Sequence, residues 1–350
     1  KKNPLGGLSR KSVVVNNYRS KHNTDPVILD AGDVFFASAV LASQNAEGDK
    51  LQAKGLLQGY ETIGCDALNV GGFDLAAGKD FLLSLANDSS IPFISANLTD
   101  TNDILLFPPY AIVEKNGFKV GVTGVSNLVP EHVKDVRKRP YVEEANQVIA
   151  ELRSTVDFIV LLANVHRKHV KGIVQQIPDA DYIFISRDTQ RTRPEIKQEE
   201  GGPYIYSSGN QGKYLSVVEI ELLNQHEPIM DISAAEGKIK SITKRLKKLQ
   251  DKDPEKSLEE IYADKPNVLK LVEDYRQQLV KYETIMADAV NTTKYESVAL
   301  SKKVGEDSEL LTFVDETLAS CNALRKKPIK ASKSIITPKK GPFKKKISKN

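Results

Sequence analysis

The stretch that decides the fold is Leu29-Asp30-Ala31-Gly32-Asp33-Val34-Phe35. It completes a short apolar run from Pro26 that is typical of a buried strand, and it places an aspartate directly after a glycine where that strand ends. In α/β sheets, ligands bind outside the carboxyl ends of the strands. The stretch therefore predicts a layered α/β domain with Asp33 at its ligand-binding edge.

Hydrophobic runs of strand length alternate with helical patterns up to about residue 225. Such alternation predicts a layered α/β domain. The runs 109–114 and 118–124 flank Asn116-Gly117, which favours the positive φ angles of a two-residue hairpin, so some strands must be antiparallel. Helical patterns cover 52–63, 76–86, 142–152 and 169–176, and the other strand-like runs are 66–70, 91–96, 157–163, 181–186, 204–207 and 215–222.

Length and composition narrow the class of protein. The 350 residues are 40% hydrophobic, which is enough for a sizeable core and excludes a wholly disordered chain. The longest apolar run, 158–165, is far shorter than the roughly 18 residues of a membrane span, so we expect no transmembrane segment. Two cysteines exclude a disulfide framework and a four-cysteine zinc site. Because the chain opens with Lys1-Lys2-Asn3-Pro4, without a methionine or an apolar signal, we expect a processed or truncated product.

The charge is divided unevenly along the chain. The formal net charge is +4, but residues 325–350 contain Arg325, ten lysines and no acid, so residues 1–324 carry 39 basic against 46 acidic side chains. The tail has almost no apolar periodicity, so we expect an exposed extension whose deletion leaves folding intact. It is either a solubilising segment or a contact for a polyanion or an acidic partner.

From about residue 251, charged helical patterns dominate, with apolar residues at spacings of three and four. These stripes are expected to dock on the α/β layers or on each other, and a groove for a partner is the alternative. The sequence therefore predicts an α/β domain over residues 1–225, a linker and helical extension over 226–324, and a basic tail over 325–350.

Seven segments together carry a resemblance to a known family. Besides the opening stretch they are Leu5–Lys11, Gly64–Gly71, Ser95–Leu98, Asn116–Gly124, Asp157–Leu162 and Gly209–Tyr214. In this order and spacing, residues 5–223 resemble the calcineurin-like metallophosphoesterases, specifically their 5′-nucleotidase and UDP-sugar hydrolase branch. The resemblance implies a four-layer sandwich of two mixed sheets flanked by helices. It also implies that the first strand, with an Asp-X-His pair, lies upstream of Lys1.

The resemblance implies two metal ions, which would clamp a phosphate and activate a bound water. Asp33 matches the aspartate that bridges the metals, and it is the one metal ligand that we expect to survive, as a vestige. Gly72 and Phe73 stand where the family has Asn and His. The family's lone histidine falls on Asn164, and its Gly-His-X-His falls on the segment from Ser186 to Thr189, with Arg187 and Thr189 in place of the two imidazoles.

The substitutions predict a vestigial pocket made of Asp33, Gly72, Phe73, Asn164, Arg187 and Thr189, with no catalytic residues and no expected cofactor. Glycine, phenylalanine and arginine do not replace imidazole as ligands of a transition metal. The alternative is a site for Mg²⁺ or Ca²⁺ with oxygen ligands from Asp33, Asp74, Asn164 and Asp188. The competing interpretation is that each of these residues only caps its own loop. His166 is two positions from the lost histidine, but Arg167 and Lys168 oppose a nearby cation.

Three functions from different classes follow. The first is a pseudoenzyme, a non-catalytic extracytoplasmic scaffold or binding protein that meets a protein or an anionic surface through its helical extension or basic tail. The second is a phosphoesterase of the 5′-nucleotidase type that uses Mn²⁺, Zn²⁺ or Mg²⁺. The third, a polyanion-binding module, depends on the lysine tail alone. We do not expect nucleic acid as a partner, because basic and aromatic residues are not interleaved over the body. The extracytoplasmic location, periplasmic, secreted or at the cell surface, is implied only by the resemblance.

Cys65 precedes the strand-like run 66–70, where small apolar side chains are preferred. A free cysteine in such a place behaves as a small hydrophobe. We therefore expect Cys65 to be a buried packing residue.

Overall fold

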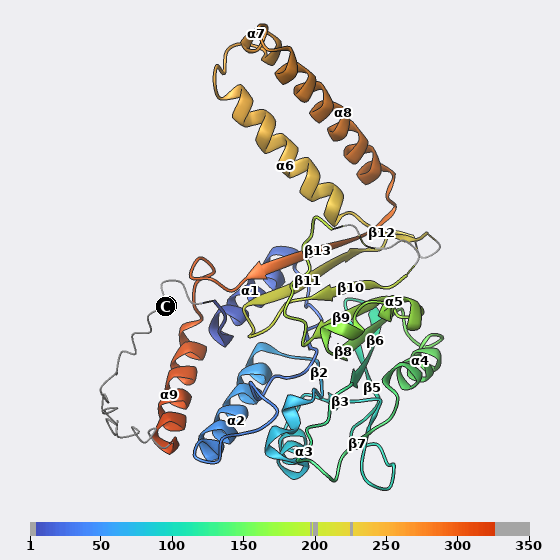
Figure 1. The fold of residues 1–350 in the computed structure, drawn as a ribbon, viewed down its shortest axis with the longest axis vertical. Coiled ribbons are helices and arrows are strands. Elements are labelled where there is room, and N and C mark those ends of the chain that lie inside the picture. The colour runs from blue at the N-terminus through green and yellow to red at the C-terminus, as the bar shows by residue number, and fades with distance from the viewer. Residues whose placement is uncertain (1–4, 197, 199–201, 225–226, 326–350) are drawn as a thin grey trace, which may run out of the picture.

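A computed structural model describes residues 5–196, 198, 202–224 and 227–325 (Figure 1). Within these ranges no helix has the length and apolar character needed to cross a membrane. The basic tail from residue 326 onward lies outside the described residues, so its predicted exposure stays a prediction.

Two sheets form the centre of the α/β body. The first contains the parallel strands β1 (Leu29–Asp30), β2 (Ala67–Asn69) and β3 (Phe93–Ile94), in that order. The second has the order β10-β9-β8-β6-β5 and is mixed, because β5 alone among its described strands runs antiparallel to its neighbour. Its strands are β5 (Tyr110–Lys115), β6 (Phe118–Ser126), β8 (Phe158–Asn164), β9 (Tyr182–Ser186) and β10 (Tyr204–Ser207).

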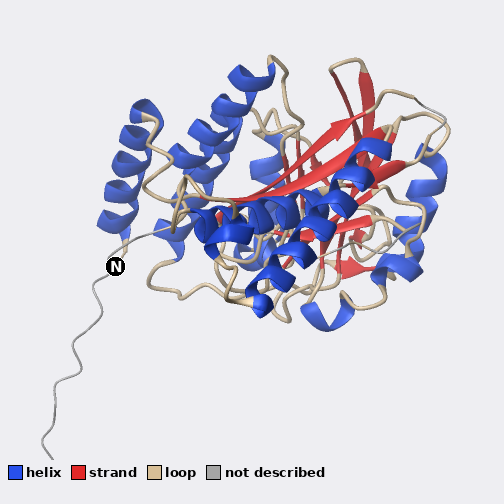
Figure 2. Cartoon of the chain, turned by 90° about the horizontal axis from the view of Figure 1, so that it is seen from above, coloured by secondary structure: helices blue, strands red, loops and turns tan. Residues whose placement is uncertain are grey.

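Helices cover the outer faces of both sheets, as the view from above also shows (Figure 2). The helices α2 (Ala46–Ile63) and α3 (Lys79–Asn87) pack on the first sheet, and α4 (Tyr141–Leu152) and α5 (Ile173–Gln176) pack on the second. A third core cluster, including Ile94 and Val122, joins the two sheets face to face. The four-layer α/β architecture expected from the sequence is therefore confirmed.

Local signals in the sequence explain several boundaries. The hairpin between β5 and β6 turns at Asn116 and Gly117, with φ angles of 53° and 81°, as the Asn-Gly pair predicts. The helical pattern over 76–86 is divided, because Gly78 adopts a φ of 90° between the 3₁₀ turn η1 (Phe73–Ala77) and α3. The pattern over 169–176 is likewise shortened to η2 (Arg167–His169) and the four residues of α5, with Gly172 between them.

A third sheet, which the sequence analysis did not predict in full, lies beside the body. Its strands are ordered β11 (Tyr214–Glu221), β13 (Asn291–Ala299) and β12 (Ile229–Asp231). The sequence pattern predicts a linker and helices over 226–324, but the structure has the strands β12 and β13 there. In β13 the alternate residues Asn291, Thr293 and Tyr295 are buried, which is the pattern of a strand with one covered face. Tyr295 stacks on Tyr206 of β10 at 4.2 Å, which ties this sheet to the second one.

The remaining helices make two different attachments. The helices α6 (Ser233–Gln250) and α8 (Pro266–Asp288) pack on each other, with the short α7 (Leu258–Ile261) at the tip, and this hairpin projects away from the body (Figure 1). The helix α9 (Ser308–Leu324) instead packs against α2 and α1 (Leu8–His22). The apolar stripes predicted over 258–282 therefore pack on each other and on α6, which is one of the predicted alternatives. A small antiparallel pair, β4 (Leu98–Thr99) and β7 (Arg137–Lys138), completes the described strands.

Cys65 is buried, at 8% exposure, and its Sγ donates to the carbonyl of Ala67 at 3.4 Å. Burial, the main cause, raises the pKa of its thiol to about 12. The expectation of a buried packing cysteine is therefore confirmed.

Candidate functional site

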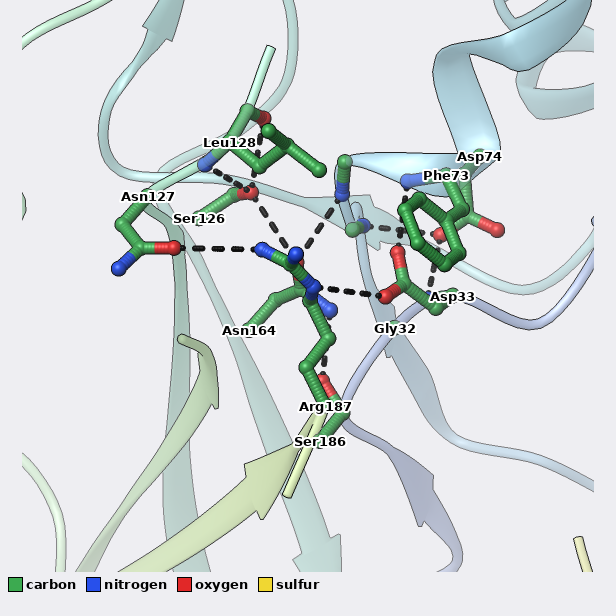
Figure 3. A network of polar contacts seen from close by, with 12 residues as sticks. Gly32, Asp33, Phe73, Asp74, Ser126, Asn127, Leu128, Asn164, Ser186 and Arg187 are labelled. Carbon is green, nitrogen blue, oxygen red and sulfur yellow. Dashed lines mark hydrogen bonds and ion pairs between the residues drawn. The ribbon is translucent and has the colours of Figure 1, made fainter. Parts of the chain in front are cut away.

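Five strand ends bring the candidate residues together at one edge of the two sheets (Figure 3). Asp33 follows β1, Phe73 and Asp74 follow β2, Asn127 follows β6, Asn164 ends β8, and Arg187 follows β9. Because parallel strands end on the same side, residues that are far apart in the sequence meet here. The side chains of Asp33, Asn164 and Arg187 converge as the resemblance implies.

Asp74 joins two of these loops through its carboxyl group, which is fully buried. Its Oδ2 accepts hydrogen bonds from the backbone N–H groups of Gly71 at 2.8 Å and Asp33 at 2.9 Å, and its Oδ1 accepts from that of Phe35 at 3.0 Å. Burial, followed by the nearby Asp33 carboxylate, raises the pKa of Asp74 to about 8. The three N–H donors oppose this rise. Asp74 therefore holds the loops in place and has no free oxygen to offer a ligand.

Asp33 is held in the left-handed backbone region, with a φ of 63°, which is uncommon for a residue other than glycine. Its Oδ1 accepts from the Phe73 N–H at 2.7 Å, whereas its buried Oδ2 accepts no hydrogen bond. Burial, the main cause, raises the pKa of the Asp33 carboxyl, and contacts with Asn164, Phe73 and Arg187 oppose that rise. Asp33 Oδ2 is therefore a buried polar atom of this site that lacks a hydrogen-bond donor among the described residues.

Arg187 supplies a positive charge to that atom. Its Nε lies 3.5 Å from Asp33 Oδ2, and the two side chains are only 16% and 11% exposed. Its Nη1 donates to Asn127 Oδ1 at 3.4 Å, and the guanidinium lies 5.2 Å from the centre of the Phe73 ring (Figure 3). No hydrogen bond joins its Nη2 to a described residue. The guanidinium thus keeps donor capacity beyond its contacts with Asp33 and Asn127.

Asn164 has both ends of its amide engaged. Its Oδ1 accepts from the Gly72 N–H at 3.0 Å and from Ser126 Oγ at 3.3 Å, and its Nδ2 donates to Ser186 Oγ at 2.7 Å. Ser186 in turn donates to the carbonyl of Ala31 at 2.7 Å. The amide therefore cross-links the loops after β1, β2, β6 and β9 at a fully buried position.

Gly72 is packed too closely for a side chain. A Cβ added there would lie 2.6 Å from the Cβ of Leu128, closer than real Cβ contacts allow. Leu128 also lines a shallow hollow of about 540 Å³, together with Ala39, Val40, Val129, Pro130, Glu131, His132 and Lys134. The asparagine that the family has at this position therefore has no room unless Leu128 moves.

Three other candidates lie outside the contacts that join Asp33, Asn164 and Arg187. Thr189 is exposed. Asp188 accepts from the Gln190 N–H at 2.9 Å, and its Oδ1 lies 3.5 Å from Arg167 Nη1. His166 accepts a hydrogen bond from the Lys168 N–H, which makes it the cap of η2. The contacts of Asp188 are local ones, as expected of a loop cap.

Sequence reasoning missed the roles of Ser126 and Asn127, because it ended the sixth strand at Gly124. The sequence feature that could have identified them is a pair of polar residues at the end of an apolar run. The same kind of position identified Asp33. Ser126 bonds Asn164, and Asn127 bonds Arg187.

The residues present do not fit the two metal ions that the fold family implies. Gly72 and Phe73 offer no ligand atom, and both ends of the Asn164 amide are engaged. Arg187 brings a fixed positive charge to Asp33, the surviving carboxylate. Nowhere in the described part of the chain do three or more His, Cys, Asp or Glu side chains group as metal ligands would. The assignment of these residues to the family's ligand positions stays a prediction.

No protein-family model matches the chain. Among curated proteins, it is similar to a 5′-nucleotidase of Vibrio parahaemolyticus, with 27% identity over 176 residues, which are 47% of this chain and 30% of the relative. The protein UshA of Yersinia enterocolitica is 26% identical over 173 residues, again 47% and 30% of the two chains. The chain therefore spans about a third of the length of these relatives.

Solved structures share the fold. A 5′-nucleotidase precursor from Thermus thermophilus superposes with a TM-score of 0.61 at 16% identity, covering 92% of this chain and 54% of the other. The calcineurin-like phosphoesterase YfkN from Bacillus subtilis gives a TM-score of 0.59 at 15% identity, with 93% and 92% covered. Both matches include more of the chain than residues 5–223, so they extend beyond the α/β body. The resemblance to the metallophosphoesterases and to their 5′-nucleotidase branch is thereby confirmed.

Proposed function

We propose that the α/β body is a binding module on the 5′-nucleotidase fold, which takes a small phosphorylated or carboxylated molecule at Arg187 and does not hydrolyse it through two metal ions. The observation that carries this proposal is the guanidinium of Arg187 at 3.5 Å from Asp33 Oδ2. A planar guanidinium suits the oxygens of a phosphate or carboxylate. Its Nη2 makes no hydrogen bond to a described residue and is available to such an anion.

Electrostatics favours an anion over a metal at this place. A divalent ion 4 Å from a guanidinium would be repelled by about 8 kcal/mol at an effective dielectric constant of 20. The hollow beside Leu128 offers mostly apolar walls for the organic part of a ligand, with Lys134 at its border.

The second candidate is a metal-dependent phosphoesterase of the 5′-nucleotidase type. Several curated relatives favour it, since they carry the name 5′-nucleotidase. Under this candidate Mn²⁺, Zn²⁺ or Mg²⁺ would be bound through Asp33 together with ligands other than those at the replaced imidazole positions, and the substrates would be nucleotides or related phosphate esters. An extracytoplasmic location, periplasmic, secreted or at the cell surface, is proposed under both candidates from the resemblance alone.

Two measurements separate the candidates. Metal content after dialysis, with the hydrolysis of nucleoside monophosphates, UDP-sugars and an aryl phosphate in added Mn²⁺, Zn²⁺ or Mg²⁺, tests the enzyme. Metal-dependent turnover that disappears in Asp33→Ala would establish the second candidate and overturn the first.

Calorimetric titration with AMP and with inorganic phosphate tests the binding module. Loss of charge-assisted hydrogen bonds predicts that Arg187→Gln weakens binding about 10- to 100-fold. The matched control is Arg167→Gln, because Arg167 forms an ion pair of the same length with Asp188 and is 47% exposed. Equal loss in both variants, or no binding by the unaltered protein, would contradict the proposal.

A further inference from the structure

The projecting hairpin has the apolar spacing of an antiparallel coiled coil. In α6 the apolar residues alternate at intervals of four and three, and in α8 a stripe of the same spacing faces them. Ile242 and Val272 are almost fully buried in this seam, at 3% and 1% exposure. The residues at these intervals are Ala235, Ile239, Ile242, Leu246 and Leu249 in α6, and Val268, Val272, Tyr275, Leu279 and Tyr282 in α8. Of these, Leu246, Leu249, Val268 and Val272 belong to one apolar cluster.

The opposite side of α6 is a row of lysines, Lys240, Lys244, Lys247 and Lys248, which we call the lysine face. Their spacing of four, three and one places them together on a helix, turned away from Ile242 and the seam. All four are exposed. At 1.5 Å per residue, the lysine face extends about 12 Å along the hairpin.

Nothing in the described structure neutralises this face. None of the four lysines forms an ion pair with a described residue. The neighbouring Arg245 is used internally, because it donates to the Tyr275 hydroxyl across the hairpin at 3.1 Å. The sole acid within α6, Glu236, is paired with Lys294 of β13 at 2.9 Å. The positive charge of the lysine face therefore points at solvent.

We propose that the lysine face docks side-on against the surface of an anionic phospholipid bilayer. Clusters of four or more lysines on one helix face are attracted to acidic headgroups. The lysine face has no aromatic side chain that could stack on nucleic-acid bases. It also has no arginine whose guanidinium could form paired hydrogen bonds with base edges, so a nucleic acid is disfavoured. The hairpin projects away from the rest of the chain, whose residues 1–324 are acidic overall (Figure 1).

The charge at the tip sets the direction of docking. Residues 251–265, which connect α6 to α8 and include α7, have six acidic side chains and three lysines. An end-on approach would therefore press negative charge against the bilayer, whereas a side-on approach presents only the lysine face. This surface is independent of the site at Arg187, so the two proposals stand or fall separately.

The test is sedimentation of the full chain with vesicles of phosphatidylcholine containing about one-third phosphatidylglycerol. Each lysine near such a surface raises the partition coefficient about five-fold, so removing four lowers it by several hundred-fold. Binding of the unaltered protein is expected to fall steeply as salt is added, and to be absent from pure phosphatidylcholine. The test variant is Lys240→Gln, Lys244→Gln, Lys247→Gln and Lys248→Gln combined, with its helix content checked by circular dichroism.

A second variant separates the lysine face from net charge. It removes the same number of exposed lysines from other surfaces of the described chain: Lys270→Gln, Lys281→Gln, Lys302→Gln and Lys303→Gln. It is expected to keep binding within about ten-fold of the unaltered protein. Equal loss in both variants, or binding by the lysine-face variant as tight as the unaltered protein's, would overturn the proposal. A folded protein that binds duplex DNA but no vesicles would overturn it in favour of a nucleic acid.

Discussion

Replacing Arg187 by methionine tests whether the ion pair with Asp33 holds the candidate site together. Methionine keeps an unbranched stem against Phe73 and removes the charge. At 3.5 Å and an effective dielectric constant of 20, the attraction between the two groups is about 5 kcal/mol before solvation is counted. Breaking a buried pair costs about 3–5 kcal/mol, because one charge is left uncompensated. Since Arg187 remains 16% exposed, we expect Arg187→Met to lower the free energy of unfolding by about 2–3 kcal/mol.

The loss should depend on pH with a definite sign. Arg187 lowers the pKa of the Asp33 carboxyl, so its removal lets that pKa rise further above the unfolded value. In the folded variant, Asp33 then keeps its proton up to a higher pH. The free energy of unfolding of the variant therefore falls as the pH rises toward the raised pKa of Asp33. The destabilisation should therefore be smaller at pH 5 than at pH 7.5.

Urea unfolding followed by circular dichroism measures the effect, since the chain has no tryptophan for fluorescence. The control is Arg167→Met, whose partner Asp188 is buried but whose own side chain is 47% exposed, so the expected loss is below about 1 kcal/mol. In an Asp33→Asn background, Arg187→Met should cost about 2 kcal/mol less than in the unaltered protein. A cost below about 0.5 kcal/mol in both backgrounds would refute the reasoning, because Arg187 would then not be holding Asp33.

Three further predictions concern packing, protonation and the tail. Gly72→Asn should lower stability by about 1–3 kcal/mol through the clash with Leu128, and Leu128→Ala should reduce that cost; equal melting temperatures of Gly72→Asn and the unaltered protein would contradict this. The folded state keeps a proton on Asp74 up to about pH 8. This group should therefore lower the free energy of unfolding between pH 4 and pH 8, by at most about 1.4 kcal/mol per pH unit. A free energy of unfolding that stays constant with pH, measured with urea, would contradict this. Deleting residues 326–350 should leave the melting temperature unchanged, since the segment has little apolar material to bury, and a large fall would show that it docks.

The alternation of apolar runs was enough to predict the layers, because a buried strand or an amphipathic helix leaves its period in the local sequence. The strand β13 was missed for a physical reason. It is stabilised by pairing with β11, about 70 residues earlier in the chain, and its few apolar side chains follow directly after the long helix α8. The strand β12 has three residues and a local pattern too short to detect. Strand pairing over long sequence separations is a property of the folded chain and leaves little local signal.

For the candidate site, the residue positions were predictable but their contacts were not. The sequence placed Asp33, Asn164 and Arg187 at strand ends, and the folded sheets bring them together. That Arg187 faces Asp33 depends on the left-handed backbone at both residues, with φ angles of 61° and 63°. Neither residue type demands that conformation. The pairing is therefore a result of the fold, and the sequence alone identified only its members.

The loops of this site are held by internal contacts of the kind that bound metals would otherwise have to supply. The Asp74 carboxylate joins the loop after β1 to the loop after β2 through three backbone N–H groups, and the Asn164 amide joins the loops after β2, β6 and β9. Arg187 then supplies the positive charge that Asp33 needs. Because Asp74 and Asn164 have hydrogen-bond partners within the chain and Arg187 compensates the charge of Asp33, the loop geometry does not require a cation. Binding a metal here would first have to displace Arg187 from Asp33, whereas binding an anion uses donors that the guanidinium still has free.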